Sequence, residues 1–160
     1  MEYRKATLHD WKQIDALYKN ARFFMAATGN KKQWANLEEV ETRVKENIEK
    51  GRLVVGLDYD EIRVAFMIAD YEPTYEQIDG PGWTSDAPYK VVHLFATKVQ
   101  GSGIGAFAMR DLQREYDHIR IDTHKDNKPM HALLKKMGFV YCGVIRLENG
   151  DPRDAFEWAK

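Results

Sequence analysis

A glycine-rich hexapeptide is the part of the sequence best suited to hold a ligand. It reads Gln100-Gly101-Ser102-Gly103-Ile104-Gly105 and stands between an apolar, β-rich segment and a segment with helical periodicity. Glycine lets bare backbone N–H groups approach a ligand, and a helix N-terminus adds about half a positive charge, so the turn suits a phosphate or pyrophosphate. A tight strand-to-helix turn that needs small residues would show the same glycine spacing. Both interpretations place the hexapeptide where a strand meets a helix.

Two nucleotide-binding motifs compete for this hexapeptide. GSGIGA satisfies the dinucleotide fingerprint G-x-G-x-x-G/A, and Asp122 stands about where a ribose-binding acid would. A dinucleotide fold begins with this unit and then needs several more βα repeats, whereas only 38 residues, 123–160, follow Asp122. A Walker A loop is excluded because no Gly-Lys-Ser/Thr follows the glycines. A dinucleotide-binding oxidoreductase therefore remains a minor alternative.

Hydrophobic patterning predicts the elements that position the hexapeptide. Thr7 with Asp10, and Asn36 with Glu39, have helix-start spacing ahead of apolar stripes, and Gly51 suits the end of the second helix. Two further helices are expected at 104–116 and 128–137, on either side of a strand at 118–122. Together, these helices and strands predict one mixed α/β domain over 1–160, with helices on both faces of a sheet. The other expected strands are 1–5, 52–57, 62–69, 89–97, 139–145 and 154–158.

The segment 71–88 has no steady period, and proline and glycine recur along it. We expect a long loop, and long loops in compact domains are often functional. Its acidic and aromatic residues could hold a cationic amine as a substrate lid, or could be a solvated loop with its rings folded back on the core. Gln33 and Trp34 could form the opposite wall or a packed corner. The residues of the loop that suggest a lid are Glu72, Glu76, Asp79 and Asp86, with Tyr71, Tyr75, Trp83 and the flanking Tyr89.

Composition excludes several classes of protein. The 24 basic residues nearly balance 25 acidic ones, for a formal charge of −1, so no global field would collect nucleic acid. The single cysteine, Cys142, allows no internal disulfide, and the first residues carry no signal-peptide core. No apolar run approaches the roughly 20 residues of a membrane-spanning helix. We expect a cytoplasmic protein, monomer or homodimer, with no nucleic-acid or membrane partner.

The ordered motifs of the second half resemble the GNAT superfamily of acetyltransferases. The family signature Q/R-x-x-G-x-G/A is matched by Gln100, Gly103 and Gly105. An Asn after the next strand and a later Lys-x-Gly-Phe are matched by Asn127 and by 136–139. The resemblance implies an α/β (α+β mixed) fold: a twisted, mostly antiparallel sheet of about seven strands, with splayed fourth and fifth strands, flanked by about four helices.

The same resemblance implies acetyl-CoA as co-substrate. Backbone N–H groups of the glycine turn would cradle the pyrophosphate, while the edge of the fourth strand would pair with pantetheine. Asn127 would bind CoA or cap the helix that follows it. The implied CoA-binding residues are Phe95, Ala96, Thr97, Gln100, Gly101, Ser102, Gly103, Ile104, Gly105, Ala106, Asn127 and Lys136.

Catalytic side chains are less clearly marked. Many members of the family have a Tyr acid where this chain has Leu134, and Tyr141 and Cys142 are substitutes whose other interpretation is sheet packing. His93 has an intrinsic pKa suited to a general base, although a lone His in a strand is commonly structural, and His124 is a second candidate. The histidines and Cys142 show no metal-ligand spacing, so we expect no metal. The residues expected to bind the acceptor are Trp34, Tyr75, Trp83 and His124.

The function implied is transfer of an acetyl group from acetyl-CoA to a primary amine of a small molecule or peptide, by direct attack in a ternary complex. A polyamine, an amino sugar or a peptide N-terminus would each fit. The alternative, suggested by Leu134, is a non-catalytic CoA-binding or sensor protein of the same fold. The dinucleotide-binding oxidoreductase is the third possibility.

Overall fold

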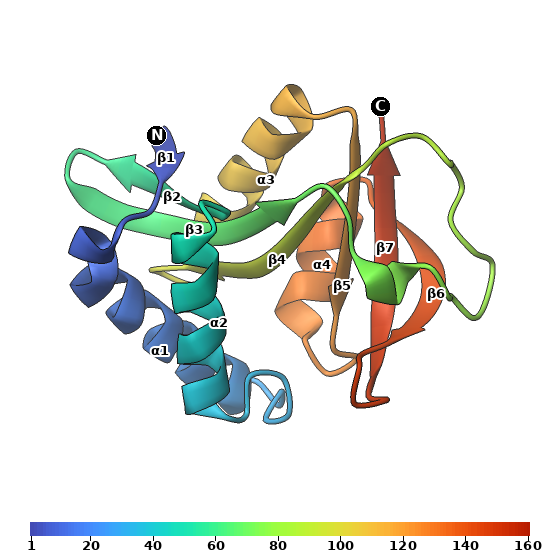
Figure 1. The fold of residues 1–160 in the computed structure, drawn as a ribbon, viewed down its shortest axis with the longest axis horizontal. Coiled ribbons are helices and arrows are strands. Elements are labelled where there is room, and N and C mark those ends of the chain that lie inside the picture. Colours follow the sequence, from blue (N-terminus) through green and yellow to red (C-terminus); the bar gives the residue numbers. More distant parts are fainter.

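A twisted sheet of seven strands forms the centre of the protein (Figure 1). The computed structural model describes residues 1–160. The strand order is β1-β2-β3-β4-β5-β7-β6, and every neighbouring pair is antiparallel except β4 and β5. This arrangement confirms the predicted fold class and is not the parallel sheet of a dinucleotide-binding fold, so that alternative is wrong. The strands are β1 Glu2–Lys5, β2 Leu53–Asp58, β3 Glu61–Ala69, β4 Lys90–Thr97, β5 His118–Thr123, β6 Val140–Arg146 and β7 Pro152–Ala159.

Four α-helices begin and end close to the predicted positions. The side-chain oxygen of Asn36 accepts a hydrogen bond from the Glu39 N–H at 3.2 Å, which satisfies one free donor at the start of the second helix. Gly51, just beyond its end, has the expected positive φ of 67°. None of the helices has the length and apolar character that crossing a bilayer requires. The helices are α1 Trp11–Ala27, α2 Leu37–Glu49, α3 Ile104–Glu115 and α4 Lys128–Lys136, with short 3-10 turns η1 Leu8–Asp10 and η2 Pro73–Tyr75.

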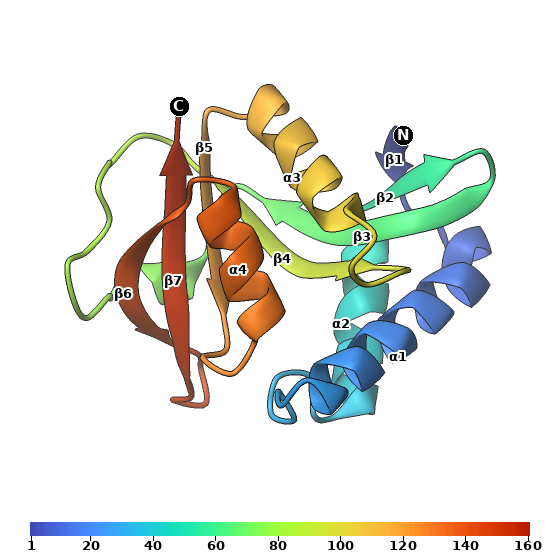
Figure 2. The same cartoon turned by 180° about the vertical axis from the view of Figure 1, so that it is seen from behind.

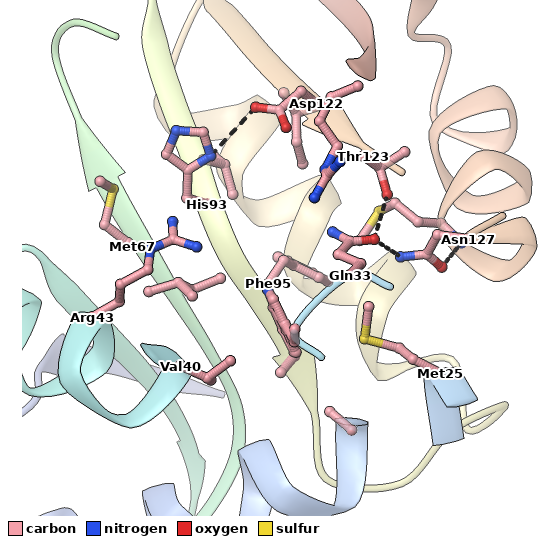
Figure 3. A pocket seen from close by; sticks show the side chains of 18 of the residues that line it. Met25, Gln33, Val40, Arg43, Met67, His93, Phe95, Asp122, Thr123 and Asn127 are labelled. Atoms are coloured by element: carbon pink, nitrogen blue, oxygen red, sulfur yellow. Dashed lines mark hydrogen bonds and ion pairs between the residues drawn. The ribbon is translucent and has the colours of Figure 1, made fainter. Parts of the chain in front are cut away.

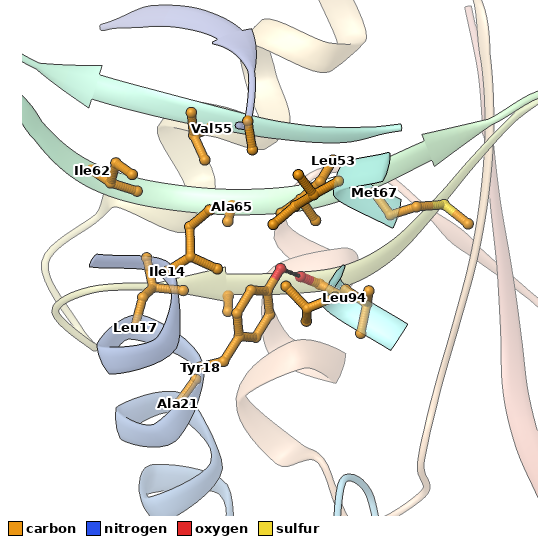
Figure 4. Packing of buried hydrophobic residues seen from close by; sticks show 14 of the residues in the cluster. Ile14, Leu17, Tyr18, Ala21, Leu53, Val55, Ile62, Ala65, Met67 and Leu94 are labelled. Carbon is orange, nitrogen blue, oxygen red and sulfur yellow. Dashed lines mark hydrogen bonds between the residues drawn. The ribbon is translucent and has the colours of Figure 1, made fainter. Parts of the chain in front are cut away.

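The helices cover the two faces of the sheet in pairs. α1 and α2 lie on one face, and α3 and α4 lie on the other, as the two opposite views show (Figures 1 and 2). Under α1, the apolar stripe of Ile14, Leu17 and Tyr18 packs on β2 and β3 (Figure 4). The buried Tyr18 hydroxyl donates to the Leu94 carbonyl at 2.7 Å, which ties α1 to β4. Each face of the sheet therefore has an apolar core that a pair of helices covers.

The sheet opens between β4 and β5. These two parallel strands are paired only through Lys90 with Ile119 and Val91 with Arg120. Beyond that point they diverge, as the predicted splay requires (Figure 2). Leu94 has a φ of 54°, rare for a residue with a branched side chain, and the β3–β4 register shifts beside it. The resulting bulge bends β4 away from β5.

The loop 71–88 is held down on the far half of the sheet. The main chains of Asp79 and Val144 exchange two hydrogen bonds, at 2.9 and 2.8 Å, and the Gly82 N–H donates to the Cys142 carbonyl at 2.8 Å. The Thr84 N–H donates to the buried Glu157 carboxylate at 2.9 Å. Most of the loop is therefore packed on β6 and β7, which favours the second of the two interpretations, a loop whose rings fold back on the core.

Candidate active site

The opening between β4 and β5 leads into one large cavity of about 1330 Å³. Its walls come from α2 and the loop before it, from β4 and β5, from the glycine turn, and from the loop between β6 and β7 (Figure 3). All twelve residues expected to bind CoA line this cavity, together with Trp34 and His93. The topology thus brings the two halves of the expected site into one space.

The glycine turn presents a row of unpaired peptide donors. Gly101 and Gly103 have φ values of 73° and 84°, which L-residues adopt only with strain, and Gly103 directly precedes α3. None of the N–H groups of residues 101–106 donates a hydrogen bond within the chain. Gln100 and Ser102 turn their side chains back onto the Thr97 and Val99 carbonyls, at 3.1 and 2.7 Å. The donors and the positive end of α3 together fit a diphosphate.

The free edge of β4 is the second feature that fits CoA. Past Val91 this edge has no β5 partner, and Phe95, Ala96 and Thr97 line the cavity along it. An unpaired edge binds an extended chain through main-chain hydrogen bonds, as peptide-like pantetheine would require. Lys136, near the end of α4, also lines the cavity and brings a positive charge.

Asn127 and Gln33 join the two walls of the cavity. Asn127 is the N-cap of α4, since its side-chain oxygen accepts from the Met130 N–H at 3.3 Å. Its amide nitrogen donates to Gln33 Oε1 at 3.2 Å, and the hydroxyl of Thr123 reaches the same oxygen at 3.4 Å. Trp34, beside Gln33, lines the cavity and packs edge-on against Tyr18, with ring centroids 5.6 Å apart. The capping role of Asn127 is confirmed, and its contact with CoA stays a prediction.

His93 lies between two carboxylates. Its Nε2 atom is 2.7 Å from Glu72 Oε1, and its Nδ1 atom is 3.6 Å from Asp122 Oδ2 (Figure 3). The bond from His93 holds the pKa of Glu72 below its usual range. The Tyr75 hydroxyl donates to Asp122 Oδ2 at 2.5 Å, and burial raises the pKa of that phenol well above its ordinary value. A histidine whose ring is oriented by acidic partners is the arrangement of a general base.

Tyr75 and Trp83 do not reach the cavity. Tyr75 is 1% exposed, and the indole N–H of Trp83 donates to its carbonyl at 2.8 Å. The guanidinium of Arg120 lies 4.3 Å from the Trp83 ring centroid and 4.2 Å from that of Tyr89. The rings of Trp83 and Tyr89 are thus occupied by a cation of the chain itself, and the positions of Tyr75 and Trp83 give no support to their assignment to acceptor binding.

Tyr141 and His124 also lie outside the cavity. Tyr141 is on the edge strand β6, half exposed, and its ring packs edge-on against Phe156 at 5.8 Å. His124 is buried beyond β5, where its Nδ1 atom accepts from the Asp126 N–H at 3.0 Å. Burial raises the pKa of the Cys142 thiol to about 11, and Leu134 is fully buried. Neither residue lines the cavity, so their positions give no support to a catalytic role for Tyr141 or to acceptor binding by His124.

Some residues of the site carried no sequence signal for the role their position suggests. Glu72 was one acid among several in the loop, and Asp122 pointed to a ribose. The structure places both acids beside His93. Arg43 of α2 and Arg153 of β7 line the same cavity. These residues are far apart in the sequence, so no local pattern could join them.

Solved structures with a similar fold are acetyltransferases, as the resemblance in sequence implies. An acetyltransferase of the GNAT family from Streptococcus agalactiae is 28% identical and superposes with a TM-score of 0.89, over 99% of this chain and 95% of that one. A putative acetyltransferase from Staphylococcus aureus is 21% identical, with a TM-score of 0.69 over 99% of each chain. A GNAT superfamily phosphinothricin acetyltransferase from Sinorhizobium meliloti, in complex with acetyl-CoA, is 14% identical, with a TM-score of 0.60 over 99% of this chain and 87% of that one.

No protein-family profile and no curated protein matches the sequence. The structural neighbours nevertheless confirm the resemblance drawn from the glycine turn and the later motifs. The chain has the fold of the GNAT acetyltransferases, and its neighbours among solved structures are acetyltransferases of that class.

Proposed function

We propose that the protein transfers the acetyl group of acetyl-CoA to a primary amine bound beside His93. One observation carries this proposal: the unpaired N–H groups of 101–106 open onto the same cavity as the His93 cluster. A diphosphate at one end and an amine at the other would place the two reactants in a single space. Such alignment can be worth roughly 7 to 11 kcal/mol of the barrier.

The residues of the chain would divide the work between binding and proton transfer. Acetyl-CoA supplies the acetyl group, and the β4 edge and the glycine turn hold and orient the molecule that carries it. Glu72, by accepting from Nε2–H of His93, would leave Nδ1 as the atom that takes the proton of the acceptor amine. An amine is mostly protonated at pH 7, so this step is needed before attack.

We propose that no side chain protonates the departing thiolate. Leu134 stands where the family commonly has a Tyr, and it is fully buried. A thiol of pKa near 8.5 is a tolerable leaving group without an acid. The positioned donors and the β4 edge would then supply most of the rate.

A non-catalytic CoA-binding protein of the same fold is the alternative that Leu134 favours. The two functions are separated by thiol release from acetyl-CoA, measured with and without a panel of primary amines. Amine-dependent release above the rate of hydrolysis supports the transferase. Binding of acetyl-CoA with no amine-dependent release supports the sensor.

We further propose that residues 1–160 act as one catalytic domain, as a monomer or homodimer in the cytoplasm, with a small-molecule or peptide acceptor and no nucleic-acid or membrane partner. The nearly balanced charge, with 24 basic and 25 acidic residues, supports this setting. Size-exclusion chromatography with light scattering tests the oligomeric state.

A further inference from the structure

Two arginines on the cavity wall form no direct ion pair with an acidic side chain. Arg43 reaches from α2 toward the middle of the cavity (Figure 3). Arg153 lies on β7, opposite Ile145 of β6, and lines the same cavity. Arg43 forms no ion pair within 4.0 Å, and the only hydrogen bond of the half-buried Arg153 side chain goes to the Pro152 carbonyl, at 2.8 Å.

The guanidinium of Arg153 is near enough to feel the charges of Arg43 and of Asp122 in the His93 cluster. Burial lowers the pKa of Arg153, the charges of Asp122 and Asp151 raise it, and the charge of Arg43 lowers it. Burial is the main cause that lowers the pKa of His124, and the charge of Arg153 lowers it further. At the end of the cavity that holds His93, the two arginines therefore make the outer part positive. Glu72 and Asp122 make the inner part, beside His93, negative.

Carboxylates on the cavity rim offset the charge of the arginines only in part, because Asp151 is the one rim acid whose charge acts on Arg153. The rim acids are all exposed, and none forms an ion pair with either guanidinium within 4.0 Å. Arg43 is exposed and Arg153 is half-buried, so a ligand anion would relieve a desolvation cost at Arg153 and pair with an accessible charge at Arg43. Arginine is also the side chain that best matches a carboxylate or phosphate, through paired N–H donors. The rim acids are Glu39, Glu46, Glu148 and Asp151.

We infer that the acceptor carries an anionic group, a carboxylate or a phosphate, which Arg43 and Arg153 bind while its amine reaches His93 and Asp122. The substrate class is thus a small amino acid or amino-alkyl phosphate, rather than a polyamine. This inference rests on the proposed acetyl transfer, since it assigns the acceptor of that reaction. It also explains the balance of charge within the cavity, because the negative inner end receives the ammonium and the positive outer end receives the anion.

The test compares matched acceptors in the acetyl-transfer assay. Each of the common α-amino acids is paired with its carboxamide, and O-phosphoethanolamine is paired with ethanolamine and with ethylenediamine. We expect the anionic member of at least one pair to have a kcat/KM about tenfold or more above its neutral or dicationic partner. The carboxylate and phosphate arms show which anion the site accepts. Equal or better use of the neutral and dicationic amines throughout would overturn the inference.

Variants locate the effect on the two arginines. Arg153→Gln and Arg43→Gln should each raise KM for the anionic acceptor about tenfold or more and leave KM for its carboxamide unchanged. Arg110→Gln, an exposed arginine of α3 outside the cavity, is the matched control and should change neither. A KM for the anionic acceptor that is unchanged in both variants contradicts the inference.

Calorimetry separates this inference from the proposed function. The same acceptors are titrated into the protein already saturated with CoA, which needs no turnover. Anion-dependent binding that is lost in Arg153→Gln supports the inference, and its absence for every acceptor overturns it. If the protein fails to bind CoA at all, the proposed function falls, and this inference falls with it.

Discussion

At the scale of single residues, the orientation of His93 is the feature on which chemistry depends. Glu72 at 2.7 Å and Asp122 at 3.6 Å leave the imidazole little freedom, and Asp122 is itself held by the Tyr75 hydroxyl at 2.5 Å. The acid 21 positions before His93 and the acid 29 positions after it meet only because β4 and β5 start side by side. A sequence pattern can nominate the histidine, but it cannot supply these partners.

Replacing His93 by Gln should lower kcat about 100-fold or more, because the acceptor amine then loses its proton acceptor. The rise of rate with pH should flatten, since no imidazole remains to be deprotonated. Steady-state kinetics from pH 6 to 9 measures both effects, and the affinity for acetyl-CoA should be unchanged. A variant with the wild-type pH profile would remove His93 from the mechanism.

At the scale of elements, the glycine turn and the loop 71–88 show what local sequence can and cannot predict. Helix starts at Asn36 and Asn127 and the turn at 100–105 depend on neighbouring residues, and the structure places them as predicted. Local sequence leaves two interpretations of the loop open, because what decides between them is remote: Trp83 packs on Arg120 of β5, and the Thr84 N–H donates to Glu157 of β7. β7 begins at Pro152, two residues before the predicted Asp154, because Arg146 of β6 pairs with Pro152.

Gly143 should be the glycine of the loop contact that tolerates least change. It has a φ of 134°, and a Cβ there would lie 2.2 Å from the Asp79 carbonyl oxygen, which is backbone and cannot move alone. We expect Gly143→Ala to lower the free energy of unfolding by about 2 kcal/mol or more, through strain and through loss of the Asp79–Val144 bridge. Urea denaturation measures this loss in the free energy of unfolding.

Gly82→Ala is the matched control for backbone strain. Gly82 also has a positive φ, of 89°, but a Cβ there meets nothing within 4 Å. Its cost should therefore be limited to strain, about 1 to 2 kcal/mol. Similar losses of stability in the two variants would contradict the close packing of the loop on β6.

At the scale of the whole molecule, a buried ionic network fastens the loop 71–88 to β5 and β7. Glu157 accepts from the Thr84 N–H at 2.9 Å and lies 2.7 Å from His118 Nε2. Burial raises the pKa of Glu157, but Thr84, His118 and Arg120 together outweigh it and hold this pKa below its usual range. The position of Glu72, and through it that of His93, depends on the loop that this network anchors.

Stability should therefore fall with acid. Because the folded-state pKa of Glu157 is depressed, its contribution is present above the unfolded pKa, near 4.3, and is lost as pH falls through the folded value. Glu157→Gln should destabilise the protein at pH 7 by about 1 to 3 kcal/mol and make the loss below about pH 5 shallower. Urea midpoints measured from pH 3 to 7 test this.

Glu46→Gln is the control, because Glu46 is exposed and forms no ion pair within 4.0 Å. Its unfolding curve should follow that of the wild type at each pH. If Glu157→Gln keeps the full acid dependence of the wild type, Glu157 is not a source of that dependence.

The most direct measurement is isothermal titration calorimetry of the wild-type protein with acetyl-CoA and with acetyl-pantetheine, which carries the same acetyl arm but no diphosphate. The free N–H groups of 101–106 predict that acetyl-CoA binds about 100-fold or more tightly than acetyl-pantetheine, since charge-assisted hydrogen bonds to a diphosphate contribute about 1.5 to 3 kcal/mol each. Equal affinity for the two compounds, or no binding of acetyl-CoA, would contradict the account.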